Sequence, residues 1–338
     1  MRILMVTDAW RPQINGVVHT LERLSETLVG YGVETRFLTP QGFLTLPLPT
    51  YPDIRLALTT PGKVARLIEA ERADHIHIVT EGPLGLMARR HCRRTGRPFT
   101  TSYHTRFPEY LSARLPVPEA WAYRWLRAFH NSGQGTLVAT KSLAEDLRAR
   151  GFNRLKPWTR GVDTTLFRPD RGKRLPFARP LFLCVGRIAV EKNLPAFLDL
   201  DLPGSKVLVG EGPELDKLKA RYPGAHFLGR LPVEDLADIY ASADVFVFPS
   251  RTDTFGNVII EALASGTPVA AYPVTGPIDI VGDGVGGIVS DDLGRAALEA
   301  LSVPRTDALV KAAGYTWSAC AEQFLDTVRE ALRCKAAP

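Results

Sequence analysis

VFVFPSRTDTFGNVIIEALASGTPVAA, residues 245–271, holds two short apolar runs separated by a glycine-containing loop and a stretch with helical spacing. The runs Val245–Phe248 and Val269–Ala271 are rich in valine, phenylalanine and alanine and are typical of buried strands. The apolar residues after Asn257 recur at helical spacing instead. A strand, a helix and a second strand in this order predict one repeat of a parallel α/β sheet.

The same alternation runs through the whole chain of 338 residues and predicts two doubly wound α/β domains in series. Further strands are expected at residues 2–7, 35–38, 75–79, 99–103 and 135–139, and at residues 181–185, 206–209 and 225–228. Residues 166–180 are rich in Pro, Arg and Gly and lack periodicity, which predicts a linker. We therefore expect domains at 1–170 and 171–338, the second closed by a helix over residues 317–332.

Composition sets limits on location and partners. With 45% hydrophobic and 23% charged residues, and no apolar run long enough to span a bilayer, the chain is expected to be cytoplasmic. Its four cysteines are widely spaced, which favours reduced, structural thiols. Residues 1–172 carry 25 Lys+Arg against 15 Asp+Glu, whereas residues 173–338 carry 17 against 21. The basic half could face nucleic acid, an anionic membrane or a phosphorylated ligand, or hold only solvated arginines.

Two loops carry the residues expected to bind a ligand. GRIAVEKN, residues 186–193, places Arg187 and Lys192 at a strand-to-helix turn, where cations and a helix N-terminus suit a diphosphate. In the second loop Gly256 lets backbone amides approach a ligand, and Asp253 and Glu261 flank it. Glu261 falls about one turn into an otherwise apolar helix, so its carboxylate needs partners such as sugar hydroxyls.

GRIAVEKN followed by DTFGNVIIEALASGTP resembles the retaining GT-B glycosyltransferases of family 4 over almost the whole chain. The resemblance implies two Rossmann-like domains facing across a cleft that holds a nucleotide sugar. It implies that Arg187 and Lys192 bind the donor diphosphate and Glu261 the ribose. The family's E-x7-E pair appears here as Asp253 and Glu261. The donor-binding residues expected are Gly16, Gly186, Arg187, Lys192, Gly210, Asp253, Phe255, Gly256, Asn257, Val258 and Glu261.

The first domain agrees with this resemblance. PQINGV, residues 12–17, is similar to the family's glycine loop, and TEGPLG, residues 80–85, to another loop that faces the cleft. SYHT, residues 102–105, is similar to the loop whose histidine reaches the transferred sugar. His104, Arg187, Lys192 and Asp253 are therefore the residues expected to act in catalysis.

No metal or other cofactor is expected, because arginine, lysine and helix N-termini can neutralise the leaving diphosphate. His75 and His77 would share one face of a strand but lack a third ligand, so they are expected to pack within the sheet. A dehydrogenase is the alternative from a different class. Its nucleotide fingerprint is incomplete here, since Gly210 and Gly212 are not followed by the third glycine.

The motif set, with SYHTRFPEYL at residues 102–111, is similar to glycolipid synthases and GDP-mannose-dependent mannosyltransferases. The first hypothesis is transfer from UDP-glucose or a related UDP-sugar to a lipid such as diacylglycerol. The alternative is a GDP-mannose-dependent α-mannosyltransferase acting on a soluble or phosphatidylinositol acceptor. The non-enzymatic alternative is a lectin-like or nucleotide-sugar-sensing protein. No nucleic-acid partner is expected.

Residues 119–130 predict an amphipathic helix with an aromatic face. Trp121, Trp125 and Phe129 recur every four residues, with Ala122 and Leu126 widening the same face. Such aromatics with neighbouring cations suit the surface of an anionic bilayer, although an aromatic stripe also suits core packing. The residues expected to face the acceptor or the cytoplasmic side of the membrane are Arg106, Arg114, Trp121, Arg124, Trp125 and Arg127.

Overall fold

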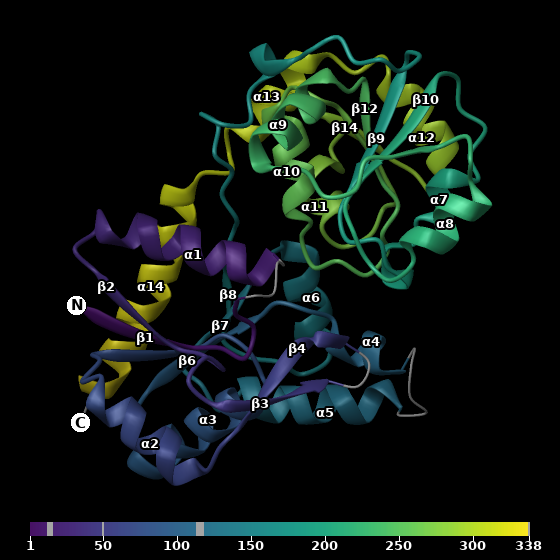
Figure 1. Ribbon diagram of the computed structural model, residues 1–338. Coiled ribbons are helices and arrows are strands. Elements are labelled where there is room, and N and C mark those ends of the chain that lie inside the picture. The colour runs from purple at the N-terminus through teal and green to yellow at the C-terminus, as the bar shows by residue number, and fades with distance from the viewer. Residues whose placement is uncertain (12–15, 49–50, 113–117, 337–338) are drawn as a thin grey trace. The chain divides into compact units, whose positions relative to one another are not determined.

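The computed structural model describes residues 1–11, 16–48, 51–112 and 118–336 and divides into two compact units (Figure 1). The first unit comprises residues 1–160 together with the C-terminal residues from Trp317, and the second comprises Gly161–Thr316. Both chain ends therefore belong to the first unit. No helix among the described residues is long and apolar enough to cross a membrane.

The first unit is built on a parallel sheet of six strands in the order β2-β1-β5-β6-β7-β8. Its strands are β1 Arg2–Val6, β2 Glu34–Leu38, β5 His75–Ile78, β6 Phe99–Tyr103, β7 Thr136–Val138 and β8 Leu155–Pro157. Its helices are α1 Gly16–Val29, α2 Pro61–Ala70, α3 Pro83–Thr95, α4 Phe107–Ser112, α5 Glu119–His130, α6 Lys141–Ala149 and α14 Trp317–Ala336. The order reverses between β1 and β5.

Helices cover both faces of this sheet. On one face α1 packs with α14, where Leu24 and Phe324 are fully buried in one cluster with Met5 of β1. On the other face α2 and α3 bury Ile68 and Leu84. The closing helix was predicted to belong to the second domain, but it is part of the first unit.

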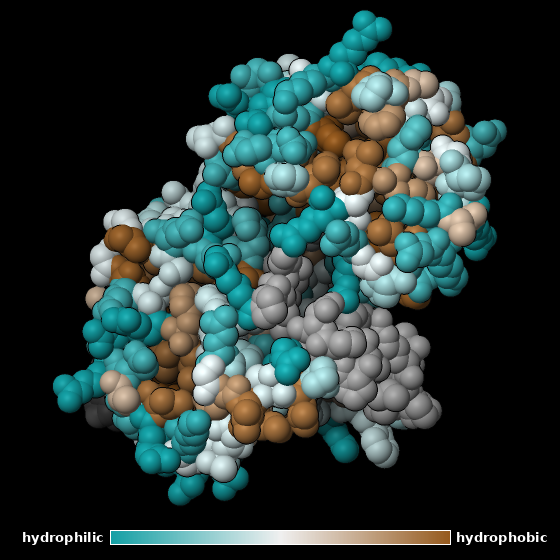
Figure 2. Space-filling model, in the orientation of Figure 1, coloured by the Kyte–Doolittle hydropathy of each residue, from teal (hydrophilic) through white to brown (hydrophobic). Residues whose placement is uncertain are grey.

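A two-stranded antiparallel hairpin, β3 Leu44–Leu48 with β4 Tyr51–Leu58, lies outside this sheet and was not predicted. Its prolines are unusual in strands, which hides the pattern. Leu44 and Leu58 are paired and are 81% and 51% exposed. Figure 2 shows apolar residues gathered at the edge of the first unit where Figure 1 places β3 and α3.

The second unit has a parallel sheet of six strands in the order β11-β10-β9-β12-β13-β14. Its strands are β9 Leu181–Val185, β10 Ser205–Val209, β11 His226–Phe227, β12 Val245–Phe248, β13 Val269–Ala271 and β14 Gly287–Val289. Its α-helices are α7 Pro195–Leu198, α8 Leu215–Arg221, α9 Val233–Ser242, α10 Asn257–Ala264, α11 Pro277–Val281, α12 Leu293–Ala300 and α13 Arg305–Ala312, and its 3-10 turns are η1 Pro169–Arg171 and η2 Val190–Lys192. The two doubly wound sheets confirm the predicted fold class.

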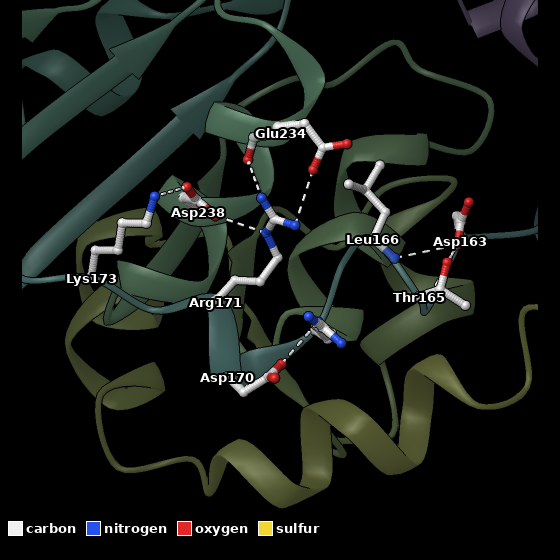
Figure 3. Close-up of polar contacts among 9 residues, drawn as sticks. Asp163, Thr165, Leu166, Asp170, Arg171, Lys173, Glu234 and Asp238 are labelled. Carbon is white, nitrogen blue, oxygen red and sulfur yellow. Dashed lines mark hydrogen bonds and ion pairs between the residues drawn. The ribbon is translucent and has the colours of Figure 1, made fainter.

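The segment predicted as a linker is fastened to α9 of the second unit (Figure 3). Arg171 donates from Nε to Asp238 at 2.7 Å and pairs with Glu234 at 3.0 Å, while Lys173 also bonds Asp238. Upstream, Oδ1 of Asp163 accepts the backbone N–H groups of residues 165 and 166, which closes a tight turn. These bonds incorporate residues 163–173 into the second unit.

Strand order indicates where a ligand would bind in each unit. Open parallel sheets bind ligands beyond the carboxyl ends of their strands, at the point where the strand order reverses. In the second unit that point lies between β9 and β12, which pair directly. In the first unit it lies between β1 and β5.

Candidate functional site

The loops that follow β9 and β12 lie side by side and are cross-linked by polar contacts. Lys192 Nζ donates to Asp253 Oδ1 at 2.6 Å. Nearby, Asn193 Nδ2 donates to the Pro249 carbonyl at 3.1 Å, with Asn193 itself in the left-handed region at φ +52°. The two motifs singled out in the sequence, 61 residues apart, therefore form one structural site.

The Lys192–Asp253 pair is half-buried, with side chains 25% and 19% exposed. Such a position strengthens the attraction between the two charges and fixes the ammonium group. Within the described part of the chain, Asp253 Oδ2 is buried without a hydrogen-bond partner. A buried carboxylate oxygen in this state can accept a hydrogen bond from a ligand hydroxyl.

The turn from β12 into α10 needs glycine at residue 256. Gly256 has φ +92°, and a Cβ there would lie 3.2 Å from the Phe248 ring. The first amides of α10, from Asn257 and Val258, have no acceptor within the helix by α-helical geometry. Phe255 is buried, and its ring packs at 5.7 Å from Tyr315. The Phe255 side chain is therefore part of the core and does not face a ligand site.

Glu261 lies in the second turn of α10 and is half-buried. Its Oε2 accepts a hydrogen bond from the hydroxyl of Tyr240 at 3.0 Å. Burial raises the pKa of Glu261 to about 7, and the Tyr240 hydrogen bond opposes that rise. This carboxylate gains most from a ligand that donates hydrogen bonds to its ionised form.

Arg187 is half-buried in the loop after β9. The preceding Gly186 is closely backed by Gly210 of the loop after β10, where an added Cβ would lie 1.9 Å from the Gly186 carbonyl oxygen. Gly210 therefore lets these two loops approach each other, which gives a packing reason for this predicted donor-binding glycine.

In the first unit His104 follows β6 and lies edge-on to Trp158 at 5.5 Å. Burial, followed by the nearby cation Arg160, lowers the pKa of His104 well below its usual range. The imidazole is therefore neutral at physiological pH. Arg160 is itself 4% exposed and donates to the Trp158 carbonyl at 2.8 Å.

Polar side chains gather beside β1 and β5, where the first sheet reverses. Asp8 accepts the backbone N–H of Leu84 at 2.9 Å and the Thr80 hydroxyl at 3.0 Å, and burial raises its pKa to about 6. Glu81 bonds the buried His130 at 2.9 Å. Asp8 and His130 were not singled out in the sequence, because nothing in the spacing of residues brings them to this loop.

Gly16, one of the predicted donor-binding residues, is the first residue of helix α1.

His75 and His77 pack inside the sheet as predicted. Both bond the hydroxyl of Thr100, at 2.9 and 2.8 Å, and His77 also bonds Ser102 at 2.8 Å. Burial lowers the pKa of each to about 3. Across the residues described, no group of three potential metal ligands is found.

The predicted aromatic face of α5 is divided in the structure. Ala122, Leu126 and Phe129 are buried, whereas Trp121 and Trp125 are 66% and 42% exposed. The expectation that all five share one face is wrong, because the tryptophans lie on the outer side of the helix.

The cations predicted for this surface also differ from one another. Arg124 and Arg127 are exposed on α5. Arg106 is not: its guanidinium bonds Glu109 and Asp146 at 3.1 Å each, and its side chain is 15% exposed. Arg114 lies outside the described residues. The outer side of α5 thus presents two tryptophans and two arginines.

Comparison with known proteins agrees across both units. A family model described as Glycosyltransferase Family 4 matches residues 14–166, and one described as Glycosyl transferases group 1 matches residues 179–302. A GDP-mannose-dependent alpha-mannosyltransferase of Mycobacterium tuberculosis is 31% identical over 307 residues, covering 83% of this chain and 81% of that protein. Alpha-monoglucosyldiacylglycerol synthase of Streptococcus pneumoniae is 26% identical, covering 89% and 78%. The solved structure of sucrose-phosphate synthase from Thermosynechococcus elongatus superposes with a TM-score of 0.77 at 19% identity, covering 99% and 100%.

Proposed function

Because this chain belongs to the family 4 glycosyltransferases with the GT-B fold, we propose that the loops after β9 and β12 hold its nucleotide diphosphate sugar. The observation that carries this proposal is the half-buried Lys192–Asp253 pair at the reversal of the second sheet. Glu261 lies one to two turns into the helix that follows. Cation, carboxylate and helix N-terminus thus converge on one site.

The diphosphate is bound by Arg187 and Lys192. A guanidinium offers a planar fork and an ammonium a compact charge, and both stabilise the negative charge that develops as the sugar–phosphate bond breaks. Asp253 holds Lys192 in place through Oδ1 and accepts a sugar hydroxyl through Oδ2. These fixed charges serve in place of a divalent cation. The sugar keeps its anomeric configuration, as the resemblance to retaining enzymes implies.

Glu261 binds the ribose of the donor. The ribose hydroxyls donate to the carboxylate, and the Tyr240 hydroxyl orients it from the protein side. The amides of Asn257 and Val258 at the start of α10 face the phosphates, since a helix N-terminus favours anions. The family resemblance assigns His104 to the transferred sugar, and burial keeps its imidazole neutral.

GDP-mannose is the donor that we favour, so the reaction is an α-mannosyl transfer. The support is the 31% identity to a GDP-mannose-dependent alpha-mannosyltransferase over most of both chains. Transfer from UDP-glucose to diacylglycerol is the second candidate, favoured by the similarity to alpha-monoglucosyldiacylglycerol synthase at 26% identity. The exposed Trp121 and Trp125 support a lipid acceptor at the cytoplasmic face of a membrane.

Calorimetric titration of GDP and of UDP into the purified protein tests the donor site and the nucleobase together. We expect GDP to bind about tenfold or more tightly than UDP, a difference of about 1.4 kcal/mol or more. EDTA should leave both affinities unchanged, because protein cations hold the phosphates. Tighter binding of UDP would favour the glucosyl alternative, and binding of neither nucleotide would contradict the assignment of these loops.

A further inference from the structure

Helix α3 carries four arginines on its outer side, Arg89, Arg90, Arg93 and Arg94, here called the α3 arginine cluster. They are spaced at i, i+1, i+4 and i+5, so their side chains rise from two adjacent turns of one helix face. Together they line a hollow of about 430 Å³. The hollow is thus lined by arginine side chains, by their aliphatic stems as well as by their guanidinium groups.

The positive charge of this cluster is not neutralised. Among the described residues, no carboxylate forms an ion pair with Arg90, Arg93 or Arg94. The nearby Glu69 pairs with His91 and Arg97 instead. Like charges four residues apart destabilise a helix, and the cluster contains two such pairs. A bound anion would relieve this repulsion.

One member of the cluster is already fixed in position. Arg89 donates from Nε to Ser132 Oγ at 2.7 Å and from Nη2 to the Ala128 carbonyl at 2.8 Å. Its guanidinium also lies 5.6 Å from the centre of the Phe129 ring. Burial, and then the charge of Arg93, lowers the pKa of Arg89. Arg89 therefore contributes a guanidinium group that is fixed in position, beside the three exposed guanidinium groups of the cluster.

The stability of helix α3 explains the presence of only two of the four arginines. Cations in the last turn complement the helix macrodipole, which accounts for Arg93 and Arg94. The effect fades beyond the last turn, so Arg89 and Arg90 gain little from it. Four arginine side chains beside one hollow suit a ligand with several anionic oxygens, because a guanidinium binds two phosphate oxygens at once.

We propose that the α3 arginine cluster is a binding site for a phosphate group. The guanidinium groups of Arg90, Arg93 and Arg94 bind the phosphate oxygens, beside the fixed Arg89. The ligand is a phosphate carried either by an anionic lipid headgroup or by a small soluble compound. The site is separate from the donor loops of the second unit, so it holds whether or not the donor assignment does.

Chemical labelling of wild-type arginines with phenylglyoxal, read residue by residue by mass spectrometry, tests this site. The two probes are inorganic phosphate and vesicles of phosphatidylcholine with phosphatidylglycerol, and pure phosphatidylcholine vesicles are the blank. With the probe at about ten times its dissociation constant, labelling of Arg90, Arg93 and Arg94 should slow about tenfold, because only the free site reacts. Arg66 and Arg148, exposed on α2 and α6, should label at an unchanged rate.

Protection by inorganic phosphate would identify a soluble phosphate as the ligand, and protection by the anionic vesicles alone would identify a lipid headgroup. An Arg90→Gln/Arg93→Gln/Arg94→Gln variant then checks the vesicle result. It should pellet less with anionic vesicles than an Arg66→Gln/Arg148→Gln/Arg329→Gln variant, which removes three exposed charges elsewhere in the same unit. Unchanged labelling with both probes would overturn the proposal. So would vesicle protection combined with equal pelleting of the two variants.

Discussion

Glu261 is a residue of the second unit whose proposed role depends on its protonation. Its folded-state pKa of about 7 lies above the ordinary value of 4.5, because burial penalises the charged form. The carboxylate therefore costs stability as pH rises from about 4.5 through 7, where the unfolded chain has already lost its proton. Ribose hydroxyls that donate to the ionised form would offset part of that cost.

We predict that nucleotide affinity rises about tenfold between pH 6 and pH 8, as the ionised fraction of Glu261 rises through its pKa of about 7. Glu261→Gln should bind more weakly at pH 8, by about 1.5–3 kcal/mol, because it loses a charge-assisted hydrogen bond. Its affinity should depend less on pH, because only the terminal phosphate of the nucleotide, with a second pKa of about 6, still titrates in this range. Calorimetry at the two pH values measures both effects, and an equal pH dependence in the variant would remove Glu261 from the ribose site.

Arg187 and Lys192 should matter most in the transition state. Arg187→Ala and Lys192→Ala are each expected to lower kcat/KM about one hundred-fold, because each removes a fixed charge that faces the leaving phosphate. The matched control is Lys217→Ala, which breaks an exposed ion pair with Glu214 at 3.0 Å. The control should retain wild-type kinetics. Activity of the Arg187 or Lys192 variant within threefold of wild type would refute its role.

At single positions, sequence patterns reveal the residues of a motif more readily than the residues that hold them in position. Asp253 and Glu261 stand out because a carboxylate beside a glycine turn or in an apolar helix needs an explanation. Tyr240 does not stand out, because its partner Glu261 comes from another segment of the chain. Arg160 does not stand out either, because His104, whose pKa it lowers, follows a different strand. Arg106 shows the converse error, since Glu109, three residues along the chain, and Asp146 of α6 both pair with it.

Among the elements, α14 shows what periodicity can and cannot predict. Its apolar spacing predicts a helix over residues 317–332, and the helix spans Trp317–Ala336. An apolar stripe specifies burial but not the sheet that buries it. The first unit takes the helix because Phe324, Leu325 and Val328 fit between α1 and the sheet, where they are fully buried.

Helix α5 divides its aromatics between the core and solvent, and the outer pair is the part suited to a bilayer. We predict that the wild-type protein pellets with anionic vesicles, and less so at high salt. Arg124→Glu/Arg127→Glu should reduce binding at least tenfold, since each surface cation near an anionic bilayer contributes about 1 kcal/mol. Trp121→Ser/Trp125→Ser should also bind less.

The control for α5 is Arg221→Glu/Arg230→Glu, which reverses two exposed charges in the second unit. It should pellet as the wild type does. A wild-type protein that ignores anionic vesicles at low salt would remove the membrane role of α5. Equal loss of binding in the control would assign the effect to net charge instead.

For the molecule as a whole, the alternation of strands and helices was predictable, apart from the β3–β4 hairpin and the edge strands β8 and β14, because each unit repeats the same simple pattern. Short buried runs alternate with amphipathic helices, and right-handed crossovers leave few ways to connect them. The boundary was harder to predict, because residues 166–180 look like a linker by composition, whereas the second unit begins at Gly161. Side-chain bonds to α9, above all from Arg171 and Lys173 to Asp238, incorporate them into the second unit.

The central claim is sugar transfer from a nucleotide diphosphate donor, and a radiolabelled transfer assay tests it most directly. Wild-type protein is incubated with GDP-[¹⁴C]mannose or UDP-[¹⁴C]glucose and total lipid extract, with and without EDTA. We predict label in an extractable lipid product with GDP-mannose, at the same rate in EDTA, and none with Lys192→Ala within the same time. Absence of transfer or donor hydrolysis with either sugar would contradict the account, and strict dependence on Mg²⁺ or Mn²⁺ would contradict the assigned phosphate site.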